Sequence, residues 1–184
     1  MRHLFITRGI PGSGKSTFLQ SAGLGPYTLS PDTLRLAYSS PVMNDVGRIV
    51  MPYQDDRRVW QQLHELLDMR MARGELIVVD ATHTTSSYFQ QYAQLAQKYR
   101  YKLYVIDFAD VPLRVCLERN RQRAPHKVVD DVVLEKMHAR LSTCVIPKQY
   151  TVIQPADVKE LIASYQQPIN LSQYEHIHHI GDIQ

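Results

Sequence analysis

The sequence contains the stretch Gly9-Ile10-Pro11-Gly12-Ser13-Gly14-Lys15-Ser16, which fits the phosphate-binding loop pattern of Gly, four residues, then Gly-Lys-Ser. An apolar run precedes it at residues 3–7, and residues 15–20 can continue as a helix. A buried strand, a tight turn and a helix start are the context that this motif requires. We therefore predict that the chain binds nucleotide phosphates here. A chance glycine-rich turn is the alternative.

Glycines let the backbone of such a loop curl so that successive N–H groups point at an anion, and the helix start adds partial positive charge. We expect Lys15 to neutralise the β- and γ-phosphate oxygens, and the hydroxyl of Ser16 to hold Mg²⁺. The expected donor is ATP with Mg²⁺, and other nucleoside triphosphates stay open. The expected nucleotide contacts within the loop are Gly9, Pro11, Gly12, Ser13, Gly14, Lys15, Ser16 and Thr17.

The composition is that of an ordinary globular chain, and 184 residues suffice for one α/β domain with a small appendage. A net charge of +3 is compatible with a polyanionic partner but does not require one. Cys116 and Cys144 lack metal-ligand spacing, so we expect reduced cysteines rather than a disulfide. No signal peptide or membrane-length apolar run is evident. We expect a cytoplasmic protein without a membrane partner.

Apolar runs alternate with helical periodicity along the chain, which predicts a doubly wound parallel sheet with helices on both faces. Ligands of such sheets bind at the carboxyl ends of the strands. Residues 39–52 read as a mobile connection, and Val133, Met137 and Leu141 as the apolar face of a late helix. The predicted strands are residues 3–7, 27–29, 75–80, 102–108 and 150–153, and the predicted helices follow at 15–20, 33–38, 55–73, 86–99, 111–121, 130–141 and 156–165.

Asp32 follows the second predicted strand, so we expect its carboxylate beside the γ-phosphate. A carboxylate there can accept the proton of an attacking hydroxyl. Arg35 lies one helical turn further on and could orient the acceptor or a neighbouring phosphate. The alternative is a helix N-cap at Asp32 and a surface residue at Arg35.

Asp80 ends the third apolar run, where nucleotide-binding proteins of this class often place an acid that organises Mg²⁺. Its alternative role is to cap the turn that follows. Thr82 could add a hydroxyl to the acceptor pocket, and His83 could reach a substrate phosphate. An isolated loop histidine is more often only solvated.

The segment from Arg114 to Lys127 is strongly basic, with Glu118 as its one acid. A helix that ends in several arginines suits a lid over the donor phosphates, and arginine can accelerate phosphoryl transfer by about 10³–10⁵. A solvated basic face is the alternative. The arginines of the segment are Arg114, Arg119, Arg121 and Arg123.

Together these features resemble the 5′-hydroxyl polynucleotide kinase domain of phage and bacterial polynucleotide kinase-phosphatases, over about residues 3–145. The phosphate loop is shared with many other families, whereas the other blocks in this order are more specific. The matching blocks are Gly9 to Thr17, Ser30-Pro31-Asp32-Thr33-Leu34-Arg35, Val78-Val79-Asp80-Ala81-Thr82 and Cys116-Leu117-Glu118-Arg119-Asn120-Arg121-Gln122-Arg123.

The resemblance implies a P-loop kinase fold with an arginine-bearing helical lid. It implies that Asp32 is the general base for a 5′-hydroxyl and that Arg35 contacts the acceptor's neighbouring phosphate. Arg119 and Arg123 match the phosphate-clamping arginines. The expected acceptor contacts are Asp32, Arg35, Asp80, Thr82 and His83, the last standing where the family often has Asn.

The implied reaction is transfer of the γ-phosphate of ATP to the 5′-hydroxyl of RNA or DNA, in nucleic acid end repair within a bacterial cell or a phage-infected host. The alternatives are a small-molecule P-loop kinase and a non-catalytic, nucleotide-gated nucleic-acid-binding module. A homodimer stays open.

The last residues resemble the opening strand and Gly-Asp-x-His motif of binuclear metallophosphatases, with Gln184 in the place of the histidine. We therefore expect a kinase domain at residues 1–172, then a linker and the start of a truncated phosphatase domain at 173–184. A covalently linked phosphatase domain is the corresponding partner. A C-terminus without such a role is the alternative.

Overall fold

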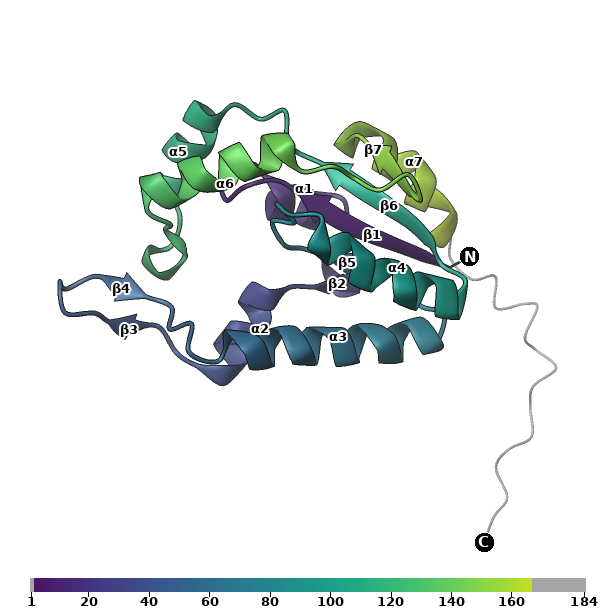
Figure 1. Ribbon diagram of the computed structural model, residues 1–184, viewed down its shortest axis with the longest axis horizontal. Coiled ribbons are helices and arrows are strands. Elements are labelled where there is room, and N and C mark those ends of the chain that lie inside the picture. Colours follow the sequence, from purple (N-terminus) through teal and green to yellow (C-terminus); the bar gives the residue numbers. More distant parts are fainter. Residues whose placement is uncertain (1, 167–184) are drawn as a thin grey trace, which may run out of the picture.

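A computed structural model describes residues 2–166, and a five-stranded parallel sheet lies at its centre (Figure 1). All six residues of the middle strand, β1, are buried. Since β1 pairs with β5 on one side and β6 on the other, the segment that follows β1 emerges at the middle of the sheet. In spatial order the strands are β2 (Thr28–Leu29), β5 (Ile77–Val79), β1 (His3–Arg8), β6 (Lys102–Asp107) and β7 (Tyr150–Ile153).

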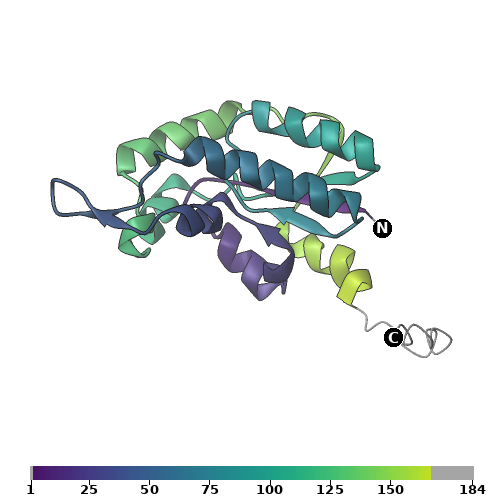
Figure 2. The ribbon, with the colours of Figure 1, turned by 90° about the horizontal axis from the view of Figure 1, so that it is seen from below.

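Helices cover both faces of the sheet, as the alternating pattern predicts (Figure 2). α3 (Asp56–Ala72) and α4 (Ser87–Tyr99) pack on one face, and α1 (Lys15–Ser21) and α7 (Pro155–Gln166) on the other. Alternate residues of β1 point to opposite faces, so Leu4 joins the α3–α4 side and Phe5 the α1–α7 side. The predicted fold class is confirmed.

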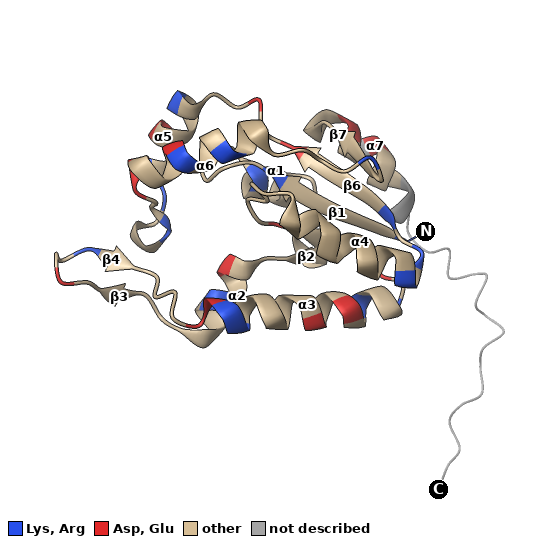
Figure 3. Ribbon diagram, viewed as in Figure 1, with Lys and Arg blue, Asp and Glu red and all other residues tan. Residues whose placement is uncertain are grey.

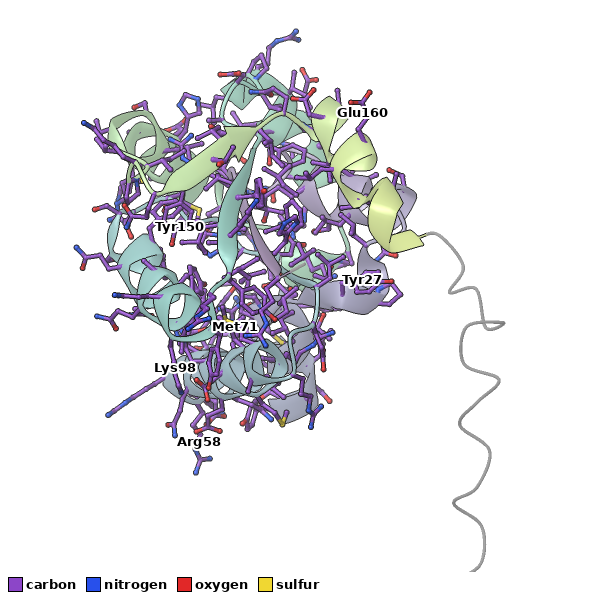
Figure 4. All side chains as sticks on the ribbon, turned by 90° about the vertical axis from the view of Figure 1, so that its right-hand side faces the viewer. Tyr27, Arg58, Met71, Lys98, Tyr150 and Glu160 are labelled. Carbon is purple, nitrogen blue, oxygen red and sulfur yellow. The ribbon has the colours of Figure 1, made fainter. Side chains whose placement is uncertain are left out.

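The buried stripe of α3 shows how the sequence specifies this packing. Val59, Leu63, Leu67 and Met71 recur every four residues and are buried. Each such side chain stabilises the fold by about 1.5–3 kcal/mol. Figure 4 shows Met71 between α3 and the sheet. Trp60, which the sequence also places on this stripe, is only half-buried.

A smaller layer covers the carboxyl ends of the strands. It consists of α5 (Leu113–Arg121), the 3₁₀ turn η2 (Pro125–Lys127) and α6 (Asp131–Thr143). Its core joins Cys116 and Leu134 to Ile10 of the phosphate loop. The prediction that Val133 lies on the apolar face of α6 is wrong, because Val133 is exposed and its neighbour Leu134 is buried instead.

The segment before α3 differs from the predicted mobile connection. After a 3₁₀ turn at η1 (Gly25–Tyr27) and helix α2 (Pro31–Tyr38), the chain forms an antiparallel hairpin of β3 (Val42–Met43) and β4 (Ile49–Val50). The Asn44 side chain closes its turn by accepting hydrogen bonds from the N–H groups of Val46 and Arg48, at 3.2 and 2.8 Å.

Within the described residues both cysteines are free, as predicted. No helix in that part of the chain is long and apolar enough to cross a membrane. The domain boundary at residue 172 and the phosphatase-like segment 173–184 lie outside the described residues and stay predictions.

Candidate active site

The phosphate loop connects β1 to α1, which is the strand-turn-helix arrangement that the motif requires. Gly12 and Gly14 adopt φ of 84° and 96°, a left-handed region that favours glycine. A Cβ on Gly12 would lie 2.3 Å from the carbonyl oxygen of Cys116 in α5. The loop backbone therefore packs directly against α5, the helix of the predicted lid. The N–H of Gly9 donates to the carbonyl oxygen of Thr82, at 3.0 Å.

Lys15 lies almost fully buried beneath this loop. Its Nζ donates to the carbonyl oxygen of Ile10 at 3.0 Å and to Oγ of Ser13 at 3.4 Å, both neutral groups. Burial lowers the pKa of Lys15 to about 8, while the nearby charges of Asp80 and Asp32 act to raise it. A buried ammonium with neutral partners is a strong site for a phosphate oxygen.

Ser16 and Asp80 form the centre of the site. Oγ of Ser16 donates to Oδ2 of Asp80 at 2.6 Å, and Oγ1 of Thr7 donates to Oδ1 at 3.0 Å. Asp80 follows β5, the strand beside β1, so neighbouring strand ends bring the two residues together. A P-loop hydroxyl beside a strand-end carboxylate suits Mg²⁺, which takes oxygen ligands and keeps most others from water and phosphates.

In residues 2–166 no group of three or more His, Cys, Asp or Glu side chains could form an all-protein metal cage. Ser16 and Asp80 would instead hold Mg²⁺ together with the phosphates of the nucleotide.

On the far side of the pocket, α2 carries Asp32 in its first turn and Arg35 one turn later. Nη1 of Arg35 donates to Oδ1 of Asp32 at 2.6 Å, while its Nε and Nη2 donate to Oδ1 of Asp56 at 2.8 and 2.5 Å. The Arg35 side chain is 13% exposed and that of Asp32 is 55% exposed. Asp32 is therefore open to a ligand, whereas Arg35 is held between two carboxylates.

Sequence reasoning missed Asp56 because it lies 21 residues after Arg35, at the start of another helix. The available signal was weak: an acid in the first turn of a helix usually needs no further explanation.

One pocket unites most of the predicted site residues. Gly9 and Ser13 do not line it: Ser13 is buried behind the loop, where its Oγ accepts from Lys15. The predicted residues that do line the pocket are Pro11, Gly12, Gly14, Lys15, Ser16, Thr17, Asp32, Arg35, Asp80, Thr82, Arg119 and Arg123.

The structure contradicts the prediction that His83 contacts the acceptor. His83 is 1% exposed, is not a pocket residue, and has both ring nitrogens engaged. Its Nδ1 lies 2.6 Å from the carbonyl oxygen of Thr7, and its Nε2 lies 3.0 Å from the hydroxyl of Tyr92. Burial lowers its pKa to about 4, so the ring is neutral at pH 7 and serves to fix the loop after β5.

Figure 3 shows basic residues along α5 and the segment after it. The arginines of this segment divide into two sets. Arg119 and Arg123 line the pocket, with Nη1 of Arg119 3.7 Å from the place of a Cβ on Gly14. Arg114 and Arg121 instead pair with acids at the surface, Glu118 at 3.0 Å and Asp131 at 2.5 Å. Only the first set faces the phosphate loop.

A buried asparagine holds the end of the lid in place. Nδ2 of Asn120 donates to the carbonyl oxygen of Val129 at 2.6 Å, and its Oδ1 accepts from the N–H of the same residue at 3.1 Å. These bonds hold the turn η2 next to the pocket, and His126 and Lys127 of this turn line it.

A phosphate loop on the middle strand, a Ser–Asp pair beside it and a lid that carries arginines define a P-loop nucleotide-binding protein with the kinase type of fold. Residues 4–144 match the AAA domain family, and the chain belongs to this family. Family, fold and site together support kinase-type phosphoryl transfer from a nucleotide.

Solved structures of several kinds share this fold. A chain of the Pnkp1/Rnl/Hen1 RNA repair complex matches with a TM-score of 0.61 at 20% identity, over 78% of this chain and 46% of that one. A sugar kinase from Janibacter sp. HTCC2649 matches with a TM-score of 0.57 at 16% identity, covering 90% of this chain and 94% of that one.

Kti12 from Chaetomium thermophilum, in complex with ADP-AlF3, matches with a TM-score of 0.58 at 15% identity, over 88% and 97% of the two chains. This chain thus spans less than half of the RNA repair chain but nearly all of the other two. A search of curated proteins gave no significant match. At these identities the likeness concerns the fold and leaves the acceptor open.

Proposed function

We propose that this protein transfers the γ-phosphate of ATP to the 5′-hydroxyl end of RNA or DNA. The observation that carries the proposal is the position of Asp32. Its exposed carboxylate opens into the same pocket as Lys15, close enough that its charge acts on the lysine. A base for the acceptor therefore lies across from the cradle for the donor phosphates.

On the donor side, N–H groups of the loop and the start of α1 bind the β- and γ-phosphates. Lys15 neutralises their oxygens from below, and Arg119 and Arg123 do so from the lid. Ser16 and Asp80 would hold Mg²⁺, which would supply further positive charge to the phosphates.

On the acceptor side, Oδ2 of Asp32 takes the proton of the 5′-hydroxyl, since Oδ1 already accepts a hydrogen bond from Arg35. The hydroxyl oxygen then bonds to the γ-phosphorus as the bond from that phosphorus to the bridging oxygen of ADP breaks. Arg35 fixes the carboxylate for this role, because Asp56 fixes Arg35 in turn.

Charge supports an acceptor that bears phosphates. Two carboxylates line the pocket, Asp32 and Asp80, against five lysines and arginines. One of these cations, Lys127, lies on η2, which contacts β4 on the acceptor side. Lys15, Arg119 and Arg123 serve the donor phosphates and Arg35 is held between two carboxylates, so Lys127 is the lysine of this lining that remains for an acceptor phosphate. Binding of such an acceptor should weaken as salt rises.

The deciding experiment compares acceptors for labelled γ-phosphate: a sugar, a nucleoside, a nucleoside 3′-monophosphate and a 5′-hydroxyl oligonucleotide. We expect transfer to increase along this series, because each step adds a group that the pocket can bind. A preference for the sugar would overturn the proposal and indicate a small-molecule kinase.

The Asp32→Asn variant separates an enzyme from a binding module. We expect it to slow transfer by about 10²–10⁴-fold, while ATP affinity stays within about twofold. Unchanged transfer in this variant would exclude Asp32 as the base. Oligonucleotide binding gated by ATP, with no transfer by the unaltered protein, would favour the module.

A further inference from the structure

Apolar and aromatic side chains line the same pocket as Asp32. Leu36, Met51, Tyr53 and Trp60 come from the α2–hairpin–α3 segment, and Val129 and Met137 from the segment after α5. We call these six residues the acceptor slot. The two segments meet where β4 contacts η2, so the slot lies between them.

Two aromatic rings of the slot pack against neighbouring side chains. The ring of Trp60 packs against that of Tyr88 in α4, with centroids 5.4 Å apart and an interplanar angle of 30°. The guanidinium of Arg35 lies over the ring of Tyr53, 5.1 Å from its centroid. Both rings line the pocket, where they can stack on a flat ligand.

On the α2 side of the slot, few polar groups are free for a polyhydroxyl ligand. On α2 the polar lining consists of Asp32 and Arg35, and the Nε, Nη1 and Nη2 atoms of Arg35 each already donate to a carboxylate. A sugar acceptor would need several directed hydrogen bonds here. An apolar, aromatic lining instead suits a flat heteroaromatic group.

We propose that the acceptor slot binds the terminal nucleobase of the acceptor, against Trp60 and Tyr53. This inference rests on the proposed function and adds a recognition site to it. Leu36 lies one helical turn after Asp32, on the same side of α2, so the slot begins next to the carboxylate that receives the hydroxyl proton. A nucleotide with its 5′-hydroxyl at Asp32 would therefore place its nucleobase in the slot.

The test uses two oligonucleotides that differ only at the 5′-terminal residue, which carries either a base or an abasic deoxyribose. Both present the same hydroxyl and phosphates. With the unaltered protein we expect kcat/KM to fall about tenfold or more for the abasic oligonucleotide, because stacking on an aromatic side chain is lost.

The Trp60→Leu variant provides the second half of the comparison. It should reduce transfer to the oligonucleotide with a base by a similar factor and leave transfer to the abasic one nearly unchanged. Trp60→Phe, which keeps a ring, should restore most of the difference. A purely structural role for Trp60 would lower transfer to both oligonucleotides equally, and that result would overturn the inference.

Tyrosine offers a matched control. Tyr53→Ala should lower transfer to the oligonucleotide with a base, whereas Tyr38→Ala, at an exposed tyrosine outside the pocket, should have no effect. Equal transfer of the unaltered protein to both oligonucleotides would overturn the inference alone. No transfer to either would overturn the proposed function, and this inference with it.

Discussion

Two glycine-containing turns of this protein have similar backbones and opposite surroundings. Gly12 in the phosphate loop and Gly47 in the β3–β4 hairpin have φ of 84° and 72°. A Cβ on Gly12 would meet the backbone of Cys116 at 2.3 Å, whereas a Cβ on Gly47 would meet nothing within 4 Å. The first turn is enclosed by the fold, and the second projects from it (Figure 1).

The difference separates the donor side of the site from the acceptor side. The phosphate loop is fixed by the strand before it, the helix after it and the lid that packs on it. The turn of the hairpin is closed by its own Asn44, and outside the hairpin β4 contacts the turn η2. A rigid cradle suits phosphates of constant shape, and an exposed arm suits acceptors that differ.

Lys15→Ala should have the largest effect, since it removes the buried charge of the cradle. We expect phosphoryl transfer to fall by about 10³-fold or more, comparable to the loss of a main electrostatic contact with the transition state. Nucleotide affinity should fall as well. Transfer of labelled γ-phosphate and calorimetry with ATP measure the two effects. Lys148→Ala, at an exposed lysine outside the pocket, is the matched control.

The two glycines give the next prediction. Both Gly12→Ala and Gly47→Ala place a side chain at positive φ, which costs about 1–3 kcal/mol. Only Gly12→Ala adds a clash with backbone, for about 1–3 kcal/mol more. Thermal unfolding should therefore show a clearly larger loss of stability for Gly12→Ala, with loss of ATP binding. Equal losses would mean that the loop can move away from α5.

The donor side could be predicted well from the sequence because its residues are close together in the chain. Glycines, Lys15 and the apolar run before them are adjacent in the chain, so one local pattern specifies strand, turn and helix together. The sheet and most helices also followed from local periodicity.

The acceptor side could not be predicted in this way, because its contacts join residues far apart in the chain. Asp56 holds Arg35 across 21 residues, and Tyr92 and Thr7 hold His83 in the interior. The hairpin has strands of only two residues, too short for an alternating pattern. Its Asn-Asp-x-Gly turn was the one available signal.

The pKa of Lys15 predicts opposite effects of pH on binding and on stability. Because burial lowers this pKa to about 8, the free protein loses the charge above pH 8, and its affinity for ADP should fall about tenfold from pH 7 to pH 9. In the unfolded chain Lys15 keeps its proton to higher pH, because its pKa there is not lowered by burial. The unfolded state therefore binds more protons, and the contribution of Lys15 to the stability of the fold rises over the same pH range and above it.

Calorimetric titration with ADP and denaturant unfolding at each pH check the two signs. The Lys15→Ala variant should lose both dependences. A fall in affinity of the same size in that variant would assign the effect to another group.

Asp56→Asn probes the acceptor side with a smaller expected effect. The amide keeps the size of the side chain but removes the charge that holds Arg35, a hydrogen bond worth about 1.5–3 kcal/mol when charged. We expect kcat to fall about tenfold as Arg35 and Asp32 lose their fixed geometry, with the Kd for ATP unchanged. Asp55→Asn is the control, since Asp55 has only a 3.8 Å contact with Arg58. A change in ATP affinity would show that the two sides are not independent.

The smallest effect should come from the ion pair that joins the hairpin to the segment before α6. Nη1 of Arg48 lies 3.5 Å from Oδ1 of Asp130, and both side chains are more than two-thirds exposed. Such pairs contribute at most about 1 kcal/mol. In a double-mutant cycle of Arg48→Ala and Asp130→Ala, unfolding should therefore give a coupling energy below this value. A larger coupling would mean that the arm is held as firmly as the cradle, and the contrast between a rigid donor side and an adaptable acceptor side would no longer hold.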